Sequence, residues 1–190
     1  GEDCVNFFTA DLHLGHGNII RHCDRPFSTV EEMDAVIIDA INDTVGPRDT
    51  LWILGDFCHR GPAAYRDRIL CRTVRLLFGN HDRRGKCEAA GFASVADVAE
   101  IRLGSQRVWL SHYPHRSWPA SHRGSWHLYG HVHGTLADAA PNSLDVGVDA
   151  VCDWSPWSED ELFEHYATMS SCSINAKQTK ARPSSTSVPS

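Results

Sequence analysis

The chain has 190 residues, 42% of them hydrophobic and 22% charged, which suits one globular domain and excludes collagen-like, coiled-coil and wholly disordered chains. Eighteen Lys and Arg residues against 24 Asp and Glu residues give a formal charge of 18 − 24 = −6. This is the wrong sign for holding duplex nucleic acid through its phosphates alone. Chemistry on phosphate groups would therefore need a local source of positive charge.

The histidines and cysteines narrow the class of protein further. Seven scattered cysteines include no Cys-x-x-Cys pair, which argues against a disulfide framework or a thiolate zinc site and favours a reducing, cytoplasmic location. We find neither a basic-then-apolar leader nor an apolar run that could span a bilayer, so we expect neither export nor membrane insertion. Twelve histidines are the anomaly, because histidine is the commonest metal ligand.

The first half of the chain alternates apolar runs with helical patterns. Strands are predicted at Val5–Ala10, Leu51–Leu54 and Thr73–Phe78, each followed by a polar cluster. The capping-box spacing of Ser28 and Glu31 predicts the start of a helix, which the apolar stripe from Met33 to Ile41 continues. A weaker helix is predicted at Ala63–Leu70.

The second half is richer in β-prone segments. These are Val98–Leu103, Arg107–Ser111, His127–Tyr129 and Ser143–Val148. They predict a second, partly antiparallel set of strands, and a further capping-box pattern over Ser158–Glu161 predicts a closing helix. Residues 170–190 have no apolar period and are rich in Ser, Thr and Pro. We therefore expect one folded domain over residues 1–169 and a disordered tail over residues 170–190.

Side chains that can bind metal follow the successive predicted strands. In chain order they are Asp11, His13, Asp56, Asn80, His81, His112, His131 and His133. Ligands of open α/β sheets bind at the carboxyl ends of the strands, and oxygen and imidazole donors without thiolate suit Mn, Fe, Zn, Ni or Co. Any one of these residues would more often be a turn former, a helix cap or a core histidine. For the whole set, that explanation would require such residues to follow five successive strands by accident, so we reject it.

Five motifs in this order carry a family resemblance. They are Asp11-x-His13, Gly55-Asp56, Gly79-Asn80-His81-Asp82, His112 and Gly130-His131-x-His133. From about Val5 to Met169 the chain resembles the calcineurin-like metallophosphoesterase superfamily. The stretches Gly15–Ile20 and Arg25–Phe27 are similar to its small stand-alone bacterial and phage phosphoesterases. The resemblance implies an α/β fold, a four-layer α/β/β/α sandwich of two packed mixed sheets.

The resemblance also implies two divalent metal ions. Asp11, His13, Asp56 and His133 would hold the first ion, and Asp56, Asn80, His112 and His131 would hold the second, so that Asp56 bridges them. Manganese is the favoured metal, with Fe, Zn, Ni, Co and Mg as alternatives. Two such ions would outweigh the charges of Asp11 and Asp56 and leave positive charge for a phosphate. A hydroxide bridging the ions would attack the ester directly.

Other residues are implied in catalysis and substrate binding. His81 would act as general acid, with Asp82 as the partner that orients it, although Asp82 could equally cap a helix. His16 and Asn18 follow the first ligand pair and could contact phosphate, and Asn18 could instead cap a helix. Arg84 could clamp a phosphate oxygen.

Three further residues could belong to the site or have an ordinary structural role. The guanidinium of Arg60 could contact phosphate like that of Arg84, but most surface arginines are only solvated. Asp145 and Asp149 are expected to close turns rather than to bind metal.

The expected activity is hydrolysis of small phosphodiesters or phosphomonoesters. The expected partner is a small phosphate ester, with no extended nucleic-acid surface and no membrane. A metal-dependent nuclease acting on DNA or RNA ends is an alternative, and the net negative charge of the chain argues against it. A catalytically silent scaffold of the same fold is a second alternative, and it would require broken ligands. The oligomeric state stays open.

Overall fold

The structure is a computed structural model that describes residues 4–178, with side chains described as far as residue 169. The chain forms two compact units, one ending at Glu159 and one beginning at Asp160, and each is described by itself. Within the described residues we find no helix with the length and apolar character needed to cross a membrane.

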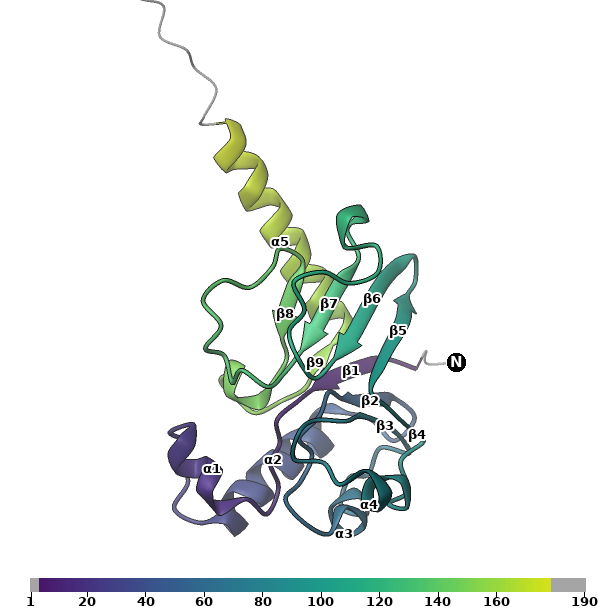
Figure 1. The fold of residues 1–190 in the computed structure, drawn as a ribbon, viewed down its shortest axis with the longest axis vertical. Coiled ribbons are helices and arrows are strands. Elements are labelled where there is room, and N and C mark those ends of the chain that lie inside the picture. The colour runs from purple at the N-terminus through teal and green to yellow at the C-terminus, as the bar shows by residue number, and fades with distance from the viewer. Residues whose placement is uncertain (1–3, 179–190) are drawn as a thin grey trace, which may run out of the picture. The chain divides into compact units, whose positions relative to one another are not determined.

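The elements of the first unit appear in Figure 1. In chain order they begin with β1 (Asn6–Thr9), α1 (Gly17–His22), α2 (Val30–Thr44), β2 (Thr50–Ile53), α3 (Pro62–Arg66), β3 (Thr73–Leu77), α4 (Arg84–Glu88) and β4 (Ser94–Ala96). They continue with β5 (Val98–Leu103), β6 (Gln106–Ser111), the 3₁₀ turn η1 (Ser121–Arg123), β7 (Trp126–Tyr129), β8 (Ser143–Asp145), the 3₁₀ turn η2 (Val148–Ala150) and β9 (Trp157–Ser158). The described part of the second unit lies in helix α5 (Glu159–Gln178).

The first sheet has the strand order β4-β3-β2-β1-β9. Strands β1 to β4 are parallel, and β9 pairs antiparallel with β1 at the edge. Alternate side chains of a strand point to opposite faces, so Phe7 and Phe8 of β1 lie on different sides of the sheet, and both are buried. Burial on both faces explains why these strands read as continuous apolar runs rather than as alternating patterns.

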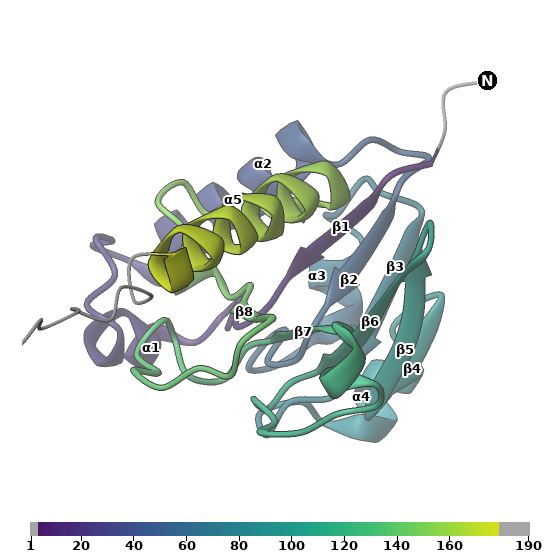
Figure 2. The same ribbon diagram turned by 90° about the horizontal axis from the view of Figure 1, so that it is seen from above.

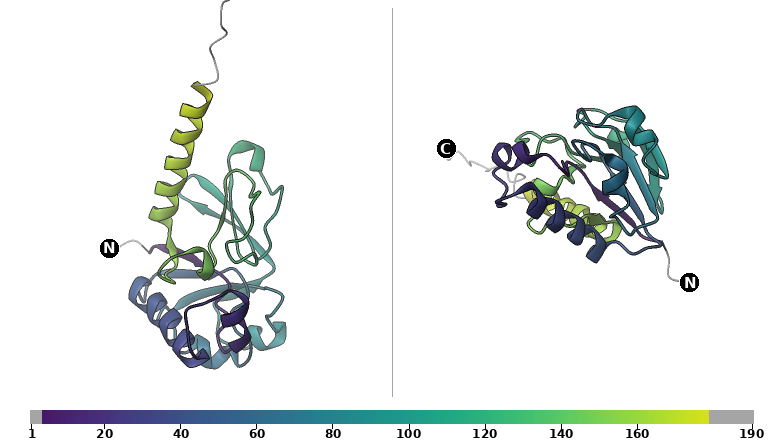
Figure 3. Two further views of the ribbon diagram at one scale, coloured as in Figure 1. Left: turned by 90° about the vertical axis from the view of Figure 1, so that its left-hand side faces the viewer. Right: turned by 90° about the horizontal axis from the view of Figure 1, so that it is seen from below.

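Helix α2 packs on one face of this sheet. Its residues Met33, Ile37 and Ile41 belong to the same buried apolar cluster as Leu51 and Leu76 of the sheet. Figure 2 shows the helix running beside β1 and β2, and Figure 3 shows α1 and α2, in purple and blue, on one side of the unit with the teal strands on the other. The helical spacing of apolar residues therefore marks the face of α2 that covers the sheet.

The cap of α2 differs from the prediction by one position. The N-cap is Thr29, whose hydroxyl accepts a hydrogen bond from the Glu32 amide at 3.2 Å. The Glu32 carboxylate accepts from the Ser28 amide at 2.8 Å. The cap is thus formed by the Thr29 hydroxyl and the Glu32 carboxylate, which bonds the Ser28 amide, rather than by Ser28 and Glu31.

The second sheet has the order β5-β6-β7-β8. Strand β5 pairs antiparallel with β6, whereas β6, β7 and β8 are parallel. A single bridge between Ala10 and Gly147 connects the end of β1 with the chain beyond β8. The expected α/β class with two mixed sheets and a partly antiparallel second half is confirmed.

Some elements depart from the sequence prediction. Strand β4 was not expected, helices α1 and α4 were expected only as alternatives in which Asn18 and Asp82 cap a helix, and α3 is shorter than the predicted Ala63–Leu70. Helix α5 runs to Gln178, beyond the predicted start of the tail at Ser170, and the sequence places no helix-breaking Gly or Pro there before Pro183. The remainder of the predicted tail, residues 179–190, lies outside the described residues.

Candidate metal centre

The carboxyl ends of the parallel strands place the predicted ligands from the first half of the chain at one edge of the first sheet, and the others follow strands of the second sheet. Asp11, Asp56 and Asn80 follow β1, β2 and β3. The backbones of the first two loops are joined by hydrogen bonds from the Asp11 amide to the Gly55 carbonyl at 3.0 Å and from the His13 amide to the Asp56 carbonyl at 2.9 Å. The parallel topology therefore fixes the spacing of the ligand residues.

One cluster of possible ligand atoms comes from Asp11, His13 and His133. One ligand atom from each lies within 4.8 Å of the others, and all three residues are at least half-buried. The fourth residue expected here, Asp56, places its Oδ2 atom 3.4 Å from Nε2 of His13. The four residues implied for the first metal ion therefore converge.

A second cluster comes from Asp56, His112 and His131, again within 4.8 Å of one another. Oδ2 of Asp56 lies 3.5 Å from Nε2 of His112, and Oδ1 of Asn80 lies 3.2 Å from the same nitrogen. The same carboxylate oxygen of Asp56 thus lies within 3.5 Å of an imidazole nitrogen of each cluster. This is the position that a bridging ligand requires.

The residues of both clusters fit divalent cations. Nε2 of His13 is buried without a hydrogen-bond partner among the described residues. Burial raises the pKa of Asp11 well above its ordinary value and lowers the pKa of His13 to about 2. A bound cation would give the orphaned nitrogen a partner and offset the burial of the carboxylates, and the oxygen and imidazole donors suit transition metals.

Two glycines allow the ligand loops to approach. A Cβ on Gly79 would lie 2.5 Å from the Asp56 amide nitrogen, and a Cβ on Gly130 would lie 2.6 Å from Oδ2 of Asp11. Both distances are too short for real Cβ atoms. The glycines beside Asn80 and His131 are therefore a steric requirement of the centre.

Asp149 has a role that the sequence did not predict. Its Oδ2 lies 2.6 Å from Nδ1 of His133, and Arg25 donates to both of its oxygens at 2.8 Å. The guanidinium of Arg25 also donates to the carbonyls of Asp11 and Leu12. Such a carboxylate fixes the histidine tautomer, so that Nε2 of His133 faces the metal position.

The turn-closing prediction for Asp149 was therefore wrong, whereas for Asp145 it is confirmed. The carboxylate of Asp145 accepts hydrogen bonds from the amides of Gly134 and Gly147, each at 2.8 Å. The sequence offered one signal for the contact of Asp149 with His133. This signal was Arg25, which belongs to the stretch that resembles the small phosphoesterases.

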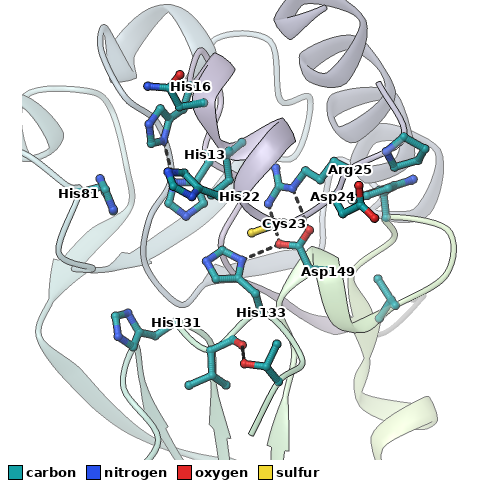
Figure 4. A pocket seen from close by; sticks show the side chains of 17 residues that line it. His13, His16, His22, Cys23, Asp24, Arg25, His81, His131, His133 and Asp149 are labelled. Carbon is teal, nitrogen blue, oxygen red and sulfur yellow. Dashed lines mark hydrogen bonds and ion pairs between the residues drawn. The ribbon is translucent and has the colours of Figure 1, made fainter. Parts of the chain in front are cut away.

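A pocket of about 980 Å³ opens beside the first cluster. Its lining includes His13, His16, Asn18, His81 and His133. Figure 4 shows the rings of His13, His81, His131 and His133 arranged around a common space, with the Arg25–Asp149–His133 contacts dashed. Nδ1 of His16 lies 3.4 Å from Nδ1 of His13, and the exposed His81 ring lies 5.0 Å from the His13 ring. The residues predicted for phosphate contact and proton donation thus border the metal ligands, and Asn18 does not cap α1.

Two predicted site residues are engaged elsewhere. The Asp82 carboxylate accepts hydrogen bonds from the amides of Asp56, Phe57 and Gly79, and among the described residues it makes no hydrogen bond to the His81 ring. Burial raises its pKa to about 6, and these amides oppose the shift. Asp82 therefore fastens two ligand loops together instead of orienting His81.

Arg84 is the second of these residues. It pairs with the exposed Asp97, and its guanidinium lies 4.3 Å from the centre of the Phe78 ring. Arg84 does not line the pocket beside the first cluster, and its contact with phosphate stays a prediction.

Comparisons with known proteins agree with this description. The chain is 30% identical over 194 residues to the Gene 66 protein of Mycobacterium phage L5, covering 83% of this chain and 92% of that protein. The chain belongs to the family of this phage protein. An uncharacterized protein of Methanocaldococcus jannaschii is 29% identical over 164 residues, covering 81% of this chain and 86% of that protein. None of the protein-family models matches the sequence.

Among solved structures, a protein of unknown function from Aquifex aeolicus superimposes with a TM-score of 0.71. The two sequences are 24% identical, and the match covers 86% of this chain and all of the other, which shows a shared fold. The resemblance to calcineurin-like metallophosphoesterases is confirmed by the two mixed sheets and by the convergence of the motif residues at the strand ends.

Proposed function

We propose that this protein is a phosphoesterase that uses two divalent metal ions. The observation that carries the proposal is the position of Asp56, whose Oδ2 lies 3.4 Å from Nε2 of His13 and 3.5 Å from Nε2 of His112. One carboxylate thus serves two adjacent sets of oxygen and nitrogen donors. Two divalent ions bound there would supply positive charge for an anionic ester and lower the pKa of a water nucleophile.

The residues of the chain have distinct tasks in this proposal. Asp11, His13 and His133 with Asp56 hold one ion, and Asn80, His112 and His131 with Asp56 hold the other. His16, which lines the pocket beside His13, contacts the phosphate together with Asn18. His81 stands exposed at the pocket wall and donates a proton to the leaving oxygen.

The substrate class is proposed as a small phosphodiester or phosphomonoester, with manganese as the favoured metal and the cytoplasm as the location. The open pocket gives room for such an ester next to the ligands. The scaffold alternative is disfavoured, because every ligand position of both clusters carries a metal-competent side chain.

The test combines metal content with hydrolysis. The wild-type protein should bind two Mn²⁺ ions per chain and hydrolyse bis(p-nitrophenyl) phosphate, with Ni²⁺, Co²⁺, Zn²⁺ and Mg²⁺ compared in parallel. Asp56→Asn should lose both ions and nearly all turnover, because the bridging charge serves both positions. As a control, the exposed Asp138→Asn should keep both. Two bound metals without hydrolysis of any aryl phosphate or nucleotide would reject the proposal, as would normal activity of the Asp56 variant.

A further inference from the structure

A second pocket of about 230 Å³ lies between the loop after β2 and the short helix α4. Its walls carry Arg60, Arg83 and Lys86 beside His59. Among the described residues that line it, there is no carboxylate. The protein has a net charge of −6, so three cations around one small pocket are a local exception.

These cations are free to bind a ligand. Arg60, Arg83 and Lys86 are exposed, and none of them forms an ion pair with a described residue. By contrast, the neighbouring Arg84 is paired with Asp97. Arginine and lysine donors that converge without a carboxylate partner form charge-assisted hydrogen bonds to phosphate.

The floor of the pocket does not repel an anion. Cys58 and Cys87 are both buried there. Burial raises the pKa of Cys58 to about 12 and the pKa of Cys87 to about 11, so both thiols are neutral near pH 7. The pocket is therefore cationic on its walls and uncharged on its floor.

This pocket adjoins the candidate metal centre. The ring of His59, which lines it, stacks on the ring of His16, with centroids 4.9 Å apart and planes within 13°. His16 in turn lines the large pocket beside His13. Arg60 and Arg83 stand on the same two loops that carry Asp56 and His81. One stacked histidine pair thus separates the two pockets.

We propose that the cationic pocket binds a second phosphate group of the substrate, so that the substrate is a phosphate ester with another phosphate beyond the one hydrolysed. This inference rests on the proposed function. The pocket has room for one phosphate, and its three cations form a compact patch rather than the stripe that tracks a long nucleic acid. A free nucleotide with two phosphates and the 5′-phosphorylated end of a short oligonucleotide both offer this chemistry.

The kinetic test uses the Mn²⁺-loaded full chain. The wild-type kcat/KM should be about tenfold higher for adenosine 3′,5′-bisphosphate than for adenosine 5′-monophosphate, because the second phosphate gains charge-assisted hydrogen bonds. Arg60→Gln/Lys86→Gln should lose this preference. The control Arg72→Gln/Arg102→Gln changes two exposed arginines outside the pocket by the same total charge and should retain it. Equal kcat/KM values for the two nucleotides, or equal losses in both double variants, would overturn the proposal.

Direct binding separates a failure of this inference from a failure of the proposed function. Calorimetry of adenosine 3′,5′-bisphosphate with the full chain, with and without Mn²⁺, requires no turnover. Binding at least tenfold weaker in Arg60→Gln/Lys86→Gln than in the control variant would support the pocket even if neither nucleotide is hydrolysed. Equal binding to both variants would overturn it. A 5′-phosphorylated trinucleotide preferred over the bisphosphate would assign the second phosphate to an oligonucleotide end, and the reverse order would assign it to a free nucleotide.

Discussion

Left-handed backbone conformations are concentrated at the proposed metal ligands. The φ angles are 57° at Asp11, 51° at His13, 54° at Asp56, 71° at His131 and 48° at His133. Residues other than glycine seldom adopt such angles, which cost about 1–3 kcal/mol each. The loop hydrogen bonds and the Asp82 carboxylate hold the chain in these conformations. The strain is therefore located where the side chains must converge.

Asp149 is expected to set the metal affinity through His133. Asp149→Asn keeps the shape of the side chain but removes the negative charge that balances the buried Arg25. Without this charge beside Nδ1, the His133 ring is less basic and binds a metal ion less tightly. The Kd for Mn²⁺, measured by calorimetry, should rise about 10–100-fold. Asp138→Asn, an exposed change of the same type, should leave the Kd near the wild-type value. A Kd for Asp149→Asn within twofold of wild type would show that His133 does not depend on this carboxylate.

His81 is expected to act on the leaving group. His81→Ala should keep two metals per chain, because the ring belongs to the exposed pocket wall, but should lower kcat by about 10²–10⁴ for an alkyl phosphate ester. With p-nitrophenolate, which leaves without a proton, the deficit should shrink. An equal loss of kcat for both leaving groups would mean that His81 positions the phosphate instead.

At the scale of single elements, the N-cap of α2 can be tested by itself. Thr29→Ala removes the hydroxyl that accepts from the Glu32 amide, so the free energy of unfolding in urea should fall by about 1 kcal/mol. Ser28→Ala is the matched control, because Ser28 contributes its backbone amide to this cap. A larger loss in Ser28→Ala than in Thr29→Ala would place the cap at the position predicted from the sequence.

The long elements were predictable and the short ones were not. Helix α2 shows its apolar stripe over four turns, and β1, β2 and β3 are buried runs that end at polar loops. Helices α1 and α4 have six and five residues, each with a glycine inside. Helices this short are not stable by themselves and depend on tertiary contacts that local sequence patterns do not record.

At the scale of the whole molecule, the candidate site was predictable where topology decides it. Parallel strands bring their carboxyl ends to one edge of a sheet, so Asp11, Asp56 and Asn80, which follow β1, β2 and β3, lie at the same edge. Arg25 and Asp149 are 124 positions apart in the sequence, and no local sequence pattern predicts their contact. The same limit explains Asp82 and Arg84, whose directions depend on the neighbouring loops and on Asp97.

Buried titratable groups make the stability of the whole fold depend on pH in opposing directions. Burial lowers the pKa values of His13, His112 and His127, which favours the folded state as pH rises. Burial raises the pKa values of Asp11 and Asp82, which favours the folded state as pH falls. The change in the free energy of unfolding on acidification is therefore a sum of opposing contributions. Comparing the pH dependence of wild type with that of a variant lacking one group isolates the contribution of that group.

His127 offers the clearest contribution, because it lies outside the metal centre. Its Nε2 accepts a hydrogen bond from the His115 amide at 2.9 Å and its Nδ1 lies 3.2 Å from the Trp109 carbonyl, so a second ring proton would face an N–H group. Burial lowers its pKa to about 4. The contribution of the neutral ring to stability is complete above its unfolded pKa of about 6.5 and is lost as pH falls towards 4. At pH 5 the loss should be about 2 kcal/mol relative to pH 8.

His127→Gln can make both hydrogen bonds and has no proton to gain, so its free energy of unfolding should fall by about 2 kcal/mol less than that of wild type between these pH values. The exposed His122→Gln should follow wild type. Parallel pH profiles of wild type and His127→Gln would show that His127 is not held neutral by the fold.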